Sequence, residues 1–84
     1  GTIVQIRTGT GTAPINGAAL TGTTRGSAIN SLGAGTTNRF PFSCSATITG
    51  LTVGTAIWID LSLAVNGGSG TARVRNISIS VIEI

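Results

Sequence analysis

Few residues in this 84-residue chain could do acid–base or nucleophilic chemistry. Asp60 and Glu83 are its two acids, Cys44 is its one cysteine, and histidine is absent. Without histidine, neither a Ser-His-Asp nor a Cys-His arrangement can be built, and too few ligands remain for a zinc or calcium site. Two carboxylates acting on a glycosidic bond would have to share one cleft. We therefore expect no catalytic residues, no metal, no cofactor and no enzymatic activity in this chain.

One pattern deserves a functional interpretation, an aromatic side chain beside an acid. Trp58 and Asp60 stand two residues apart in "TAIWIDLSLAV", so they share one face of a strand. Such a face could stack a sugar ring and hydrogen-bond its hydroxyls. We favour the alternative in which Trp58 packs under a loop or against a neighbouring subunit, with Asp60 meeting an arginine. The candidates for carbohydrate contact are Trp58, Asp60, Arg73 and Arg75.

The net charge of +3 rests on arginines that are scattered along the chain. Only Arg73 and Arg75 lie close together, and the chain has one tryptophan, two phenylalanines and no tyrosine. Nucleic-acid-binding surfaces cluster their basic residues and interleave them with aromatics. We therefore expect no nucleic-acid partner. No apolar run is long enough for a membrane-spanning helix, so we expect no membrane insertion.

The composition predicts an all-β fold. Glycine accounts for 13 residues, charged residues for 8% and hydrophobic residues for 40% of the chain, and threonine, isoleucine and valine favour strands. A chain of this length forms one domain, so we predict a single β-sandwich domain over residues 1–84. It begins at Gly1 in strand-like sequence without an initiator methionine, which we interpret as a C-terminal fragment of a larger protein.

Alternation of apolar and polar residues locates the strands. It is clear in "TIVQIRT", in "RFPFSCSATITGL" and in "TAIWIDLSLAV". Weaker signals place short strands at Ala18–Thr23 and Ala28–Leu32. Turn signals about every ten residues suggest a sandwich or a small barrel. Cys44 falls on an apolar face, which favours a small buried hydrophobe over a reactive or intermolecular thiol.

The closing stretch, "RVRNISISVIEI", changes phase twice. Near Arg75 and Asn76 the apolar positions shift by one residue, which predicts a β-bulge. Ile82 and Ile84 then place large apolar groups on the serine side of the final strand. Strands that are apolar on both faces are buried on both faces, so we expect a subunit interface there rather than a frayed terminus. The interface candidates are Val4, Ile6, Ile82 and Ile84.

The second half of the chain resembles the C-terminal domains of bacteriophage tail fibres and tailspikes. The shared features are the turn "TGLTVGT", a strand with a central Trp58, the glycine turn "NGGSG" and a closing strand that ends in "IEI". Such domains are often antiparallel jelly-roll sandwiches, similar to tumour-necrosis-factor and C1q head domains, and form homotrimers. The resemblance implies that Ile77, Ile79 and Val81 serve the core of the chain, while Ile82 and Ile84 contact two sister chains.

Three functional hypotheses follow. The first is a non-enzymatic C-terminal trimerisation and assembly module of a phage tail fibre or tailspike, a receptor-binding protein of the extracellular virion. The alternative is a carbohydrate-binding module that recognises glycan on the host cell surface. The third is a supporting domain of a polysaccharide-degrading enzyme whose active region lies upstream.

Overall fold

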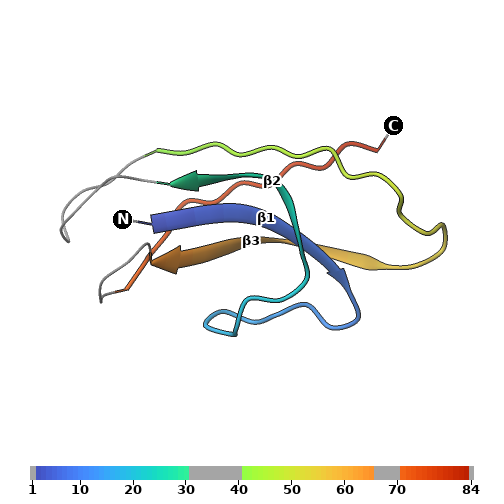
Figure 1. Cartoon of the computed structure of the whole chain (residues 1–84), viewed down its shortest axis with the longest axis horizontal. Helices are drawn as coiled ribbons and strands as arrows, with labels where there is room; N and C mark the ends of the chain where they lie inside the picture. The colour runs from blue at the N-terminus through green and yellow to red at the C-terminus, as the bar shows by residue number, and fades with distance from the viewer. Residues whose placement is uncertain (1, 31–40, 66–70, 84) are drawn as a thin grey trace.

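The computed structural model describes residues 2–30, 41–65 and 71–83. These residues contain three strands and no helix: β1 (Thr2–Thr10), β2 (Thr23–Asn30) and β3 (Ile57–Val65). The strands form one antiparallel sheet in the order β2-β1-β3, with β1 in the centre (Figure 1). The predicted all-β class is confirmed for the described residues.

β1 and β3 pair without interruption, from Thr2 opposite Val65 to Thr10 opposite Ile57. Residues that are directly opposite in an antiparallel pair point to the same face of the sheet, so the register defines two faces. The apolar face carries Val4, Ile6, Thr8, Ile59, Leu61 and Leu63. The polar face carries Gln5, Arg7, Gly9, Trp58, Asp60 and Ser62. The alternation in the sequence therefore predicted both strands and both faces.

β2 departs from the predicted pattern. One strand over Thr23–Asn30 replaces the two short strands expected at Ala18–Thr23 and Ala28–Leu32, of which the end at Leu32 lies outside the described residues. Between Val4 and Ile6 its register against β1 shifts. The shift is a bulge at Gly26, which has a φ of 70° that other residues rarely adopt. Gln5 Nε2 donates a hydrogen bond to Gly26 O over 2.9 Å and holds the bulge.

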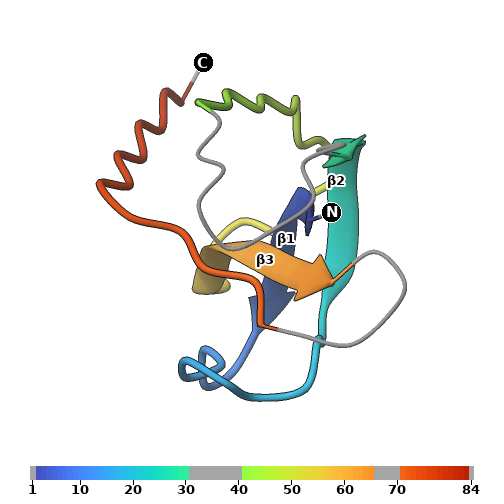
Figure 2. The ribbon, with the colours of Figure 1, turned by 90° about the vertical axis from the view of Figure 1, so that its left-hand side faces the viewer.

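Two further segments lie along the sheet without pairing to it: the middle segment (residues 41–49) and the C-terminal segment (residues 71–83). Both run alongside the sheet as drawn-out traces (Figures 1 and 2). The alternation predicted a strand in each, and neither is a strand in the described part of the chain. The physical reason is that a strand needs hydrogen bonds to the backbone of a neighbour, and neither segment forms such a ladder among the described residues.

Two backbone features lie where the sequence indicated them. In the predicted turn, Thr55 N donates to Thr52 O over 3.3 Å, and Gly54 has a φ of 84°, as the third residue of a type II turn requires. Asn76 has a φ of 57°, at the point where the alternation changes phase. No strand surrounds Asn76 in the described residues, so its positive φ is not part of the β-bulge that we predicted.

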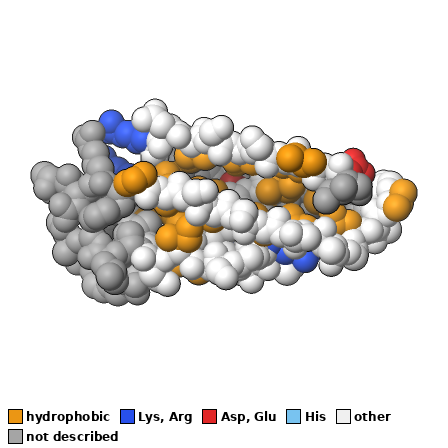
Figure 3. All heavy atoms as spheres, turned by 90° about the horizontal axis from the view of Figure 1, so that it is seen from above, with side chains coloured by type: hydrophobic (Ala, Val, Ile, Leu, Met, Phe, Trp, Pro, Cys, Tyr) orange, Lys and Arg blue, Asp and Glu red, His pale blue; other side chains and the backbone are white. Residues whose placement is uncertain are grey.

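The single chain has almost no core. Val4, 4% exposed, is the one buried apolar side chain among the described residues, and Thr8 is buried beside it at 3%. Nine large apolar side chains are exposed. Seen from above, hydrophobic side chains lie open along the length of the molecule (Figure 3). These nine side chains lie outside the strands, in the β1–β2 loop, at residues 51–53 and in the middle and C-terminal segments, while the apolar face of β1 and β3 is half-buried apart from the buried Val4 and Thr8.

Candidate functional site

The first candidate site is an open groove between the apolar face and the two unpaired segments. It has a volume of about 1960 Å³, its floor includes Val4, Ile6, Leu61 and Leu63, and its walls are residues 41–55 and 73–83. The end-on view shows the middle and C-terminal segments as two separate traces on the same side of β1 (Figure 2). The groove thus lies between the apolar face of the three-stranded sheet and two segments that are not strands in the described residues.

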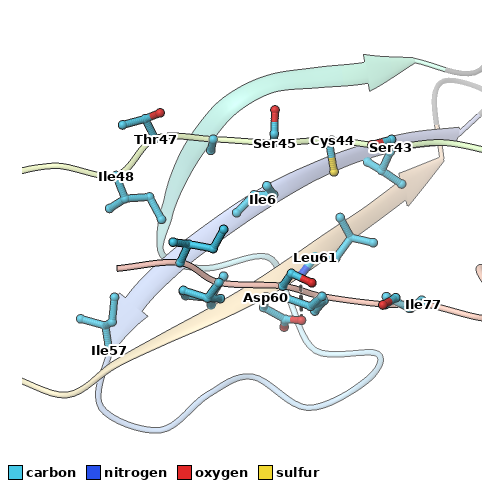
Figure 4. Close-up of a pocket in the computed structure, with 18 of the residues that line it drawn as sticks. Ile6, Ser43, Cys44, Ser45, Thr47, Ile48, Ile57, Asp60, Leu61 and Ile77 are labelled. Carbon is cyan, nitrogen blue, oxygen red and sulfur yellow. Dashed lines mark hydrogen bonds between the residues drawn. The ribbon is translucent and has the colours of Figure 1, made fainter. Parts of the chain in front are cut away.

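The middle segment presents its apolar side chains to this groove. Cys44 and Ile48 point towards the sheet, while Ser45 and Thr47 point away from it (Figure 4). The first two are half-buried and the other two are exposed. The predicted alternation of faces is therefore confirmed for these side chains, although the segment is not a strand. Cys44 is a free thiol on the apolar side, half-buried rather than buried as we predicted.

The C-terminal segment lines the groove, but its apolar side chains remain exposed. Ile77, Ile79 and Val81 are 52%, 58% and 66% exposed, so the core that they were expected to fill is not closed in the single chain. Ile82 is 86% exposed. Ile84, the last interface candidate, lies outside the described residues.

The described interface candidates lie on two sides of the groove, its floor and one of its walls. Val4 and Ile6 form part of the groove floor, and Val4 is already buried by its own chain. Ile82 lies on the opposite wall and is open to contact.

The second candidate site is a cleft of about 870 Å³ over the polar face, beneath the loop that joins β1 to β2. Trp58, Asp60, Arg73 and Arg75 all line it, so the structure brings the four carbohydrate-contact candidates together. It adds Arg7, which stands opposite Asp60 in the sheet. The sequence carried no signal for Arg7, because its place depends on the register between β1 and β3.

Trp58 lies on glycine backbone, with its indole reaching from β3 across β1. A Cβ atom at Gly9 would come within 2.6 Å of the indole Cε2, and one at Gly22 would come within 2.5 Å of Cη2. The indole Nε1 donates to Thr10 O over 3.2 Å. Gly22 ends the loop between β1 and β2, so Trp58 packs under that loop. This agrees with the interpretation we favoured and leaves less of the indole free for a sugar.

The charged groups of the cleft are only partly satisfied. Asp60 Oδ1 accepts a hydrogen bond from Leu61 N over 2.8 Å. Arg7 Nη1 donates to Thr21 O over 3.4 Å, while the buried Arg7 Nε has no hydrogen-bond partner. Arg7 and Asp60 are neighbours across strands, yet no ion pair joins them among the described residues. An arginine therefore stands beside Asp60 as we expected, but without the expected contact.

The described residues contain no group of three or more His, Cys, Asp or Glu side chains that could hold a metal ion. They also contain no helix with the length and apolar character needed to cross a membrane. Comparisons with models of known protein families, with curated proteins and with solved structures found no match for this chain. The groove and the cleft are therefore interpreted from their own geometry.

Proposed function

We propose that this chain is a non-enzymatic trimerisation and assembly module, of the kind found at the C-terminal end of bacteriophage tail fibres and tailspikes. Its partners are two sister chains, and its place is the extracellular tail of the virion. Its role is to hold three chains of a receptor-binding protein together. The assembled fold is a small antiparallel sandwich of jelly-roll type, in which sister chains cover the apolar face.

The observation that carries this proposal is the exposed area of the single chain. The chain exposes 6718 Å², whereas a compact monomer of 8.3 kDa is expected to expose about 4,600 Å². The excess is about 2,100 Å², which suits two interfaces of about 1,000 Å² on each chain, close to the share of one partner in a stable complex.

The chemistry of the exposed surface supports the same proposal. The open groove is lined largely by apolar and small polar residues, and exposed apolar patches of this extent mark protein contacts. Small domains that cannot build a sufficient core gain stability by oligomerising. With a single cysteine, this chain cannot use an internal disulfide instead.

Native mass spectrometry of the isolated chain tests this function. We expect a species with three times the mass of the chain, and we expect it to dissociate directly to unfolded monomers. A matched pair of variants locates the contact: Ile82→Ser should weaken the trimer at least tenfold, because a fully buried isoleucine contributes about 1.5–3 kcal/mol, while Ser80→Ala should leave it unchanged. A stable, folded monomer of the unmodified chain would refute the proposal.

A second function is favoured by one specific observation, the cleft that gathers Trp58, Asp60, Arg73 and Arg75. On this alternative the chain is a carbohydrate-binding module for host cell-surface glycan. Asp60→Asn should then abolish binding on a glycan array, whereas Glu83→Gln, which makes the same change of charge outside the cleft, should not. Binding that survives Trp58→Ala would show that the indole is not the sugar platform.

A further inference from the structure

We propose that the two unpaired segments form strands between chains: the C-terminal segment of one chain pairs, through its backbone, with the middle segment of the next. This inference rests on the proposed assembly function and specifies how the sister chains meet. A second copy of this chain thus fills the open side of the groove. It does so with a strand that pairs through its backbone, as well as with side chains.

The backbone of both segments is unpaired among the described residues. The middle and C-terminal segments alternate apolar and polar residues as strands do, yet the described residues show no ladder along either segment. Each segment therefore presents a row of N–H and C=O groups that another strand could use. Such groups are strong hydrogen-bonding groups that lose free energy when they are buried without a partner.

The edges of these two segments carry little of the usual protection. Natural edge strands that must stay single are blocked by charged side chains, by prolines or by bulges. In the middle segment the one such residue is Pro41, at its start, and the stretch from residue 77 to residue 82 has neither a proline nor a charge. Lysine, the residue most used to protect edges, is absent from the whole chain. The sequence therefore permits pairing on both segments.

The positions of the two segments favour head-to-tail pairing between chains. The middle segment already lies against β2 on one side, where a Cβ atom at Gly26 would come within 2.6 Å of Ser45 O. Its other side and the C-terminal segment border the same opening (Figure 2). A chain with two different free edges joins head to tail, and such contacts close into a ring where the rotation between neighbours closes, as in the proposed trimer, and otherwise give an open filament. A pairing of like with like would give a dimer instead.

Proline scanning tests the backbone pairing. Ser78→Pro and Ile79→Pro each remove one N–H donor, on opposite edges of the segment, and Ser78→Ala and Ile79→Ala are the matched controls. We expect at least one proline variant to lower the trimer association constant about tenfold or more relative to its alanine control, since each of the three interfaces loses a hydrogen bond of about 1 kcal/mol. Amide exchange in β1 and β3 would report whether each variant keeps its sheet.

The outcomes separate this inference from the function on which it rests. Proline variants that form trimers as well as their alanine controls would overturn the strand pairing while the trimer stands. A monomeric unmodified chain would overturn both. In the trimer, alternate amides of residues 77–83 should exchange slowly, because only one edge of the segment is paired, and their protection should be lost on dilution.

Disulfide trapping tests the head-to-tail order, because Cys44 is the only native cysteine and lies in the middle segment. We expect at least one of Ile77→Cys, Ile79→Cys and Val81→Cys to give covalent trimers on mild oxidation, through bonds between Cys44 and the new thiol of the next chain. Cys44→Ser in the same background should reduce these to dimers at most. If all three variants give only covalent dimers or monomers, the head-to-tail pairing is wrong.

Discussion

At the scale of the residue, Trp58 both packs closely and forms a hydrogen bond. Its indole lies on Gly9 and Gly22 and donates a hydrogen bond to Thr10 O. The glycines at these two positions are explained by space, because a Cβ atom at either one would overlap the ring. The polar face is therefore built around a tryptophan that holds the β1–β2 loop, and the cleft beside it is a consequence of that packing.

Gly22→Ala should destabilise the fold by about 2–4 kcal/mol, since a Cβ atom would come within 2.5 Å of both the Trp58 indole and Thr8 O and would add the strain of a positive φ. Gly17→Ala is the matched control: its φ is 85°, close to the 78° of Gly22, but a Cβ atom there meets nothing within 4 Å. Urea unfolding followed by the fluorescence of Trp58 measures both. Equal losses for the two variants would contradict the proposed packing.

At the scale of the element, the sequence predicted side-chain faces better than it predicted pairing. Alternation located β1 and β3 and assigned the inward side of Cys44 and Ile48, because burial imposes a period of two on any extended chain beside a core. It failed for β2, whose Gly26 bulge and Arg25 on the apolar face interrupt the pattern. It also could not show that the two outer segments lack partners, because alternation carries no information about the neighbour.

Arg25 is a polar residue on the apolar face, and its Nε donates to Thr8 Oγ1 over 2.9 Å in a partly buried site. Thr8→Val should therefore destabilise the sheet by about 1–3 kcal/mol, because it leaves that N–H without its acceptor. Thermal unfolding monitored by circular dichroism measures the loss. The double variant Thr8→Val with Arg25→Leu should recover most of it, and a double variant as unstable as the sum of both changes would show that the pair is not coupled.

Removal of residues 82–84 tests the tail as an element. Because Ile82 is 86% exposed in the single chain, its loss removes little contact within the chain but should reduce the stability of the trimer far more than Ser78→Ala or Ser80→Ala. Chemical cross-linking at low concentration would compare the assembled fractions. Equal effects of the truncation and the serine variants would indicate a frayed end without a role in contact.

At the scale of the whole molecule, the described residues form one antiparallel sheet, and the two buried side chains among them, Val4 and Thr8, both lie on its apolar face. The cleft residues could be proposed from the sequence because Trp58 and Asp60 share a strand face, whereas Arg7 joined them only through the register of the sheet. The open groove was not predicted, because the alternation assigned Ile77, Ile79 and Val81 to a closed core, whereas these side chains are 52%, 58% and 66% exposed.

If sister chains complete the fold, unfolding is coupled to dissociation, and the melting temperature must rise with protein concentration. We expect the midpoint followed by Trp58 fluorescence to increase steadily over a hundredfold range of concentration. Ile82→Ser should lower the midpoint at every concentration. A midpoint that does not depend on concentration would indicate that each chain is stable by itself.

Sedimentation equilibrium of the isolated chain tests the central claim most directly, since it measures mass in solution without a label or a variant. We expect a mass of three chains at micromolar concentration, with the β-sheet signal lost as dilution drives the trimer apart. A mass of one chain, together with an intact β-sheet signal, would contradict it.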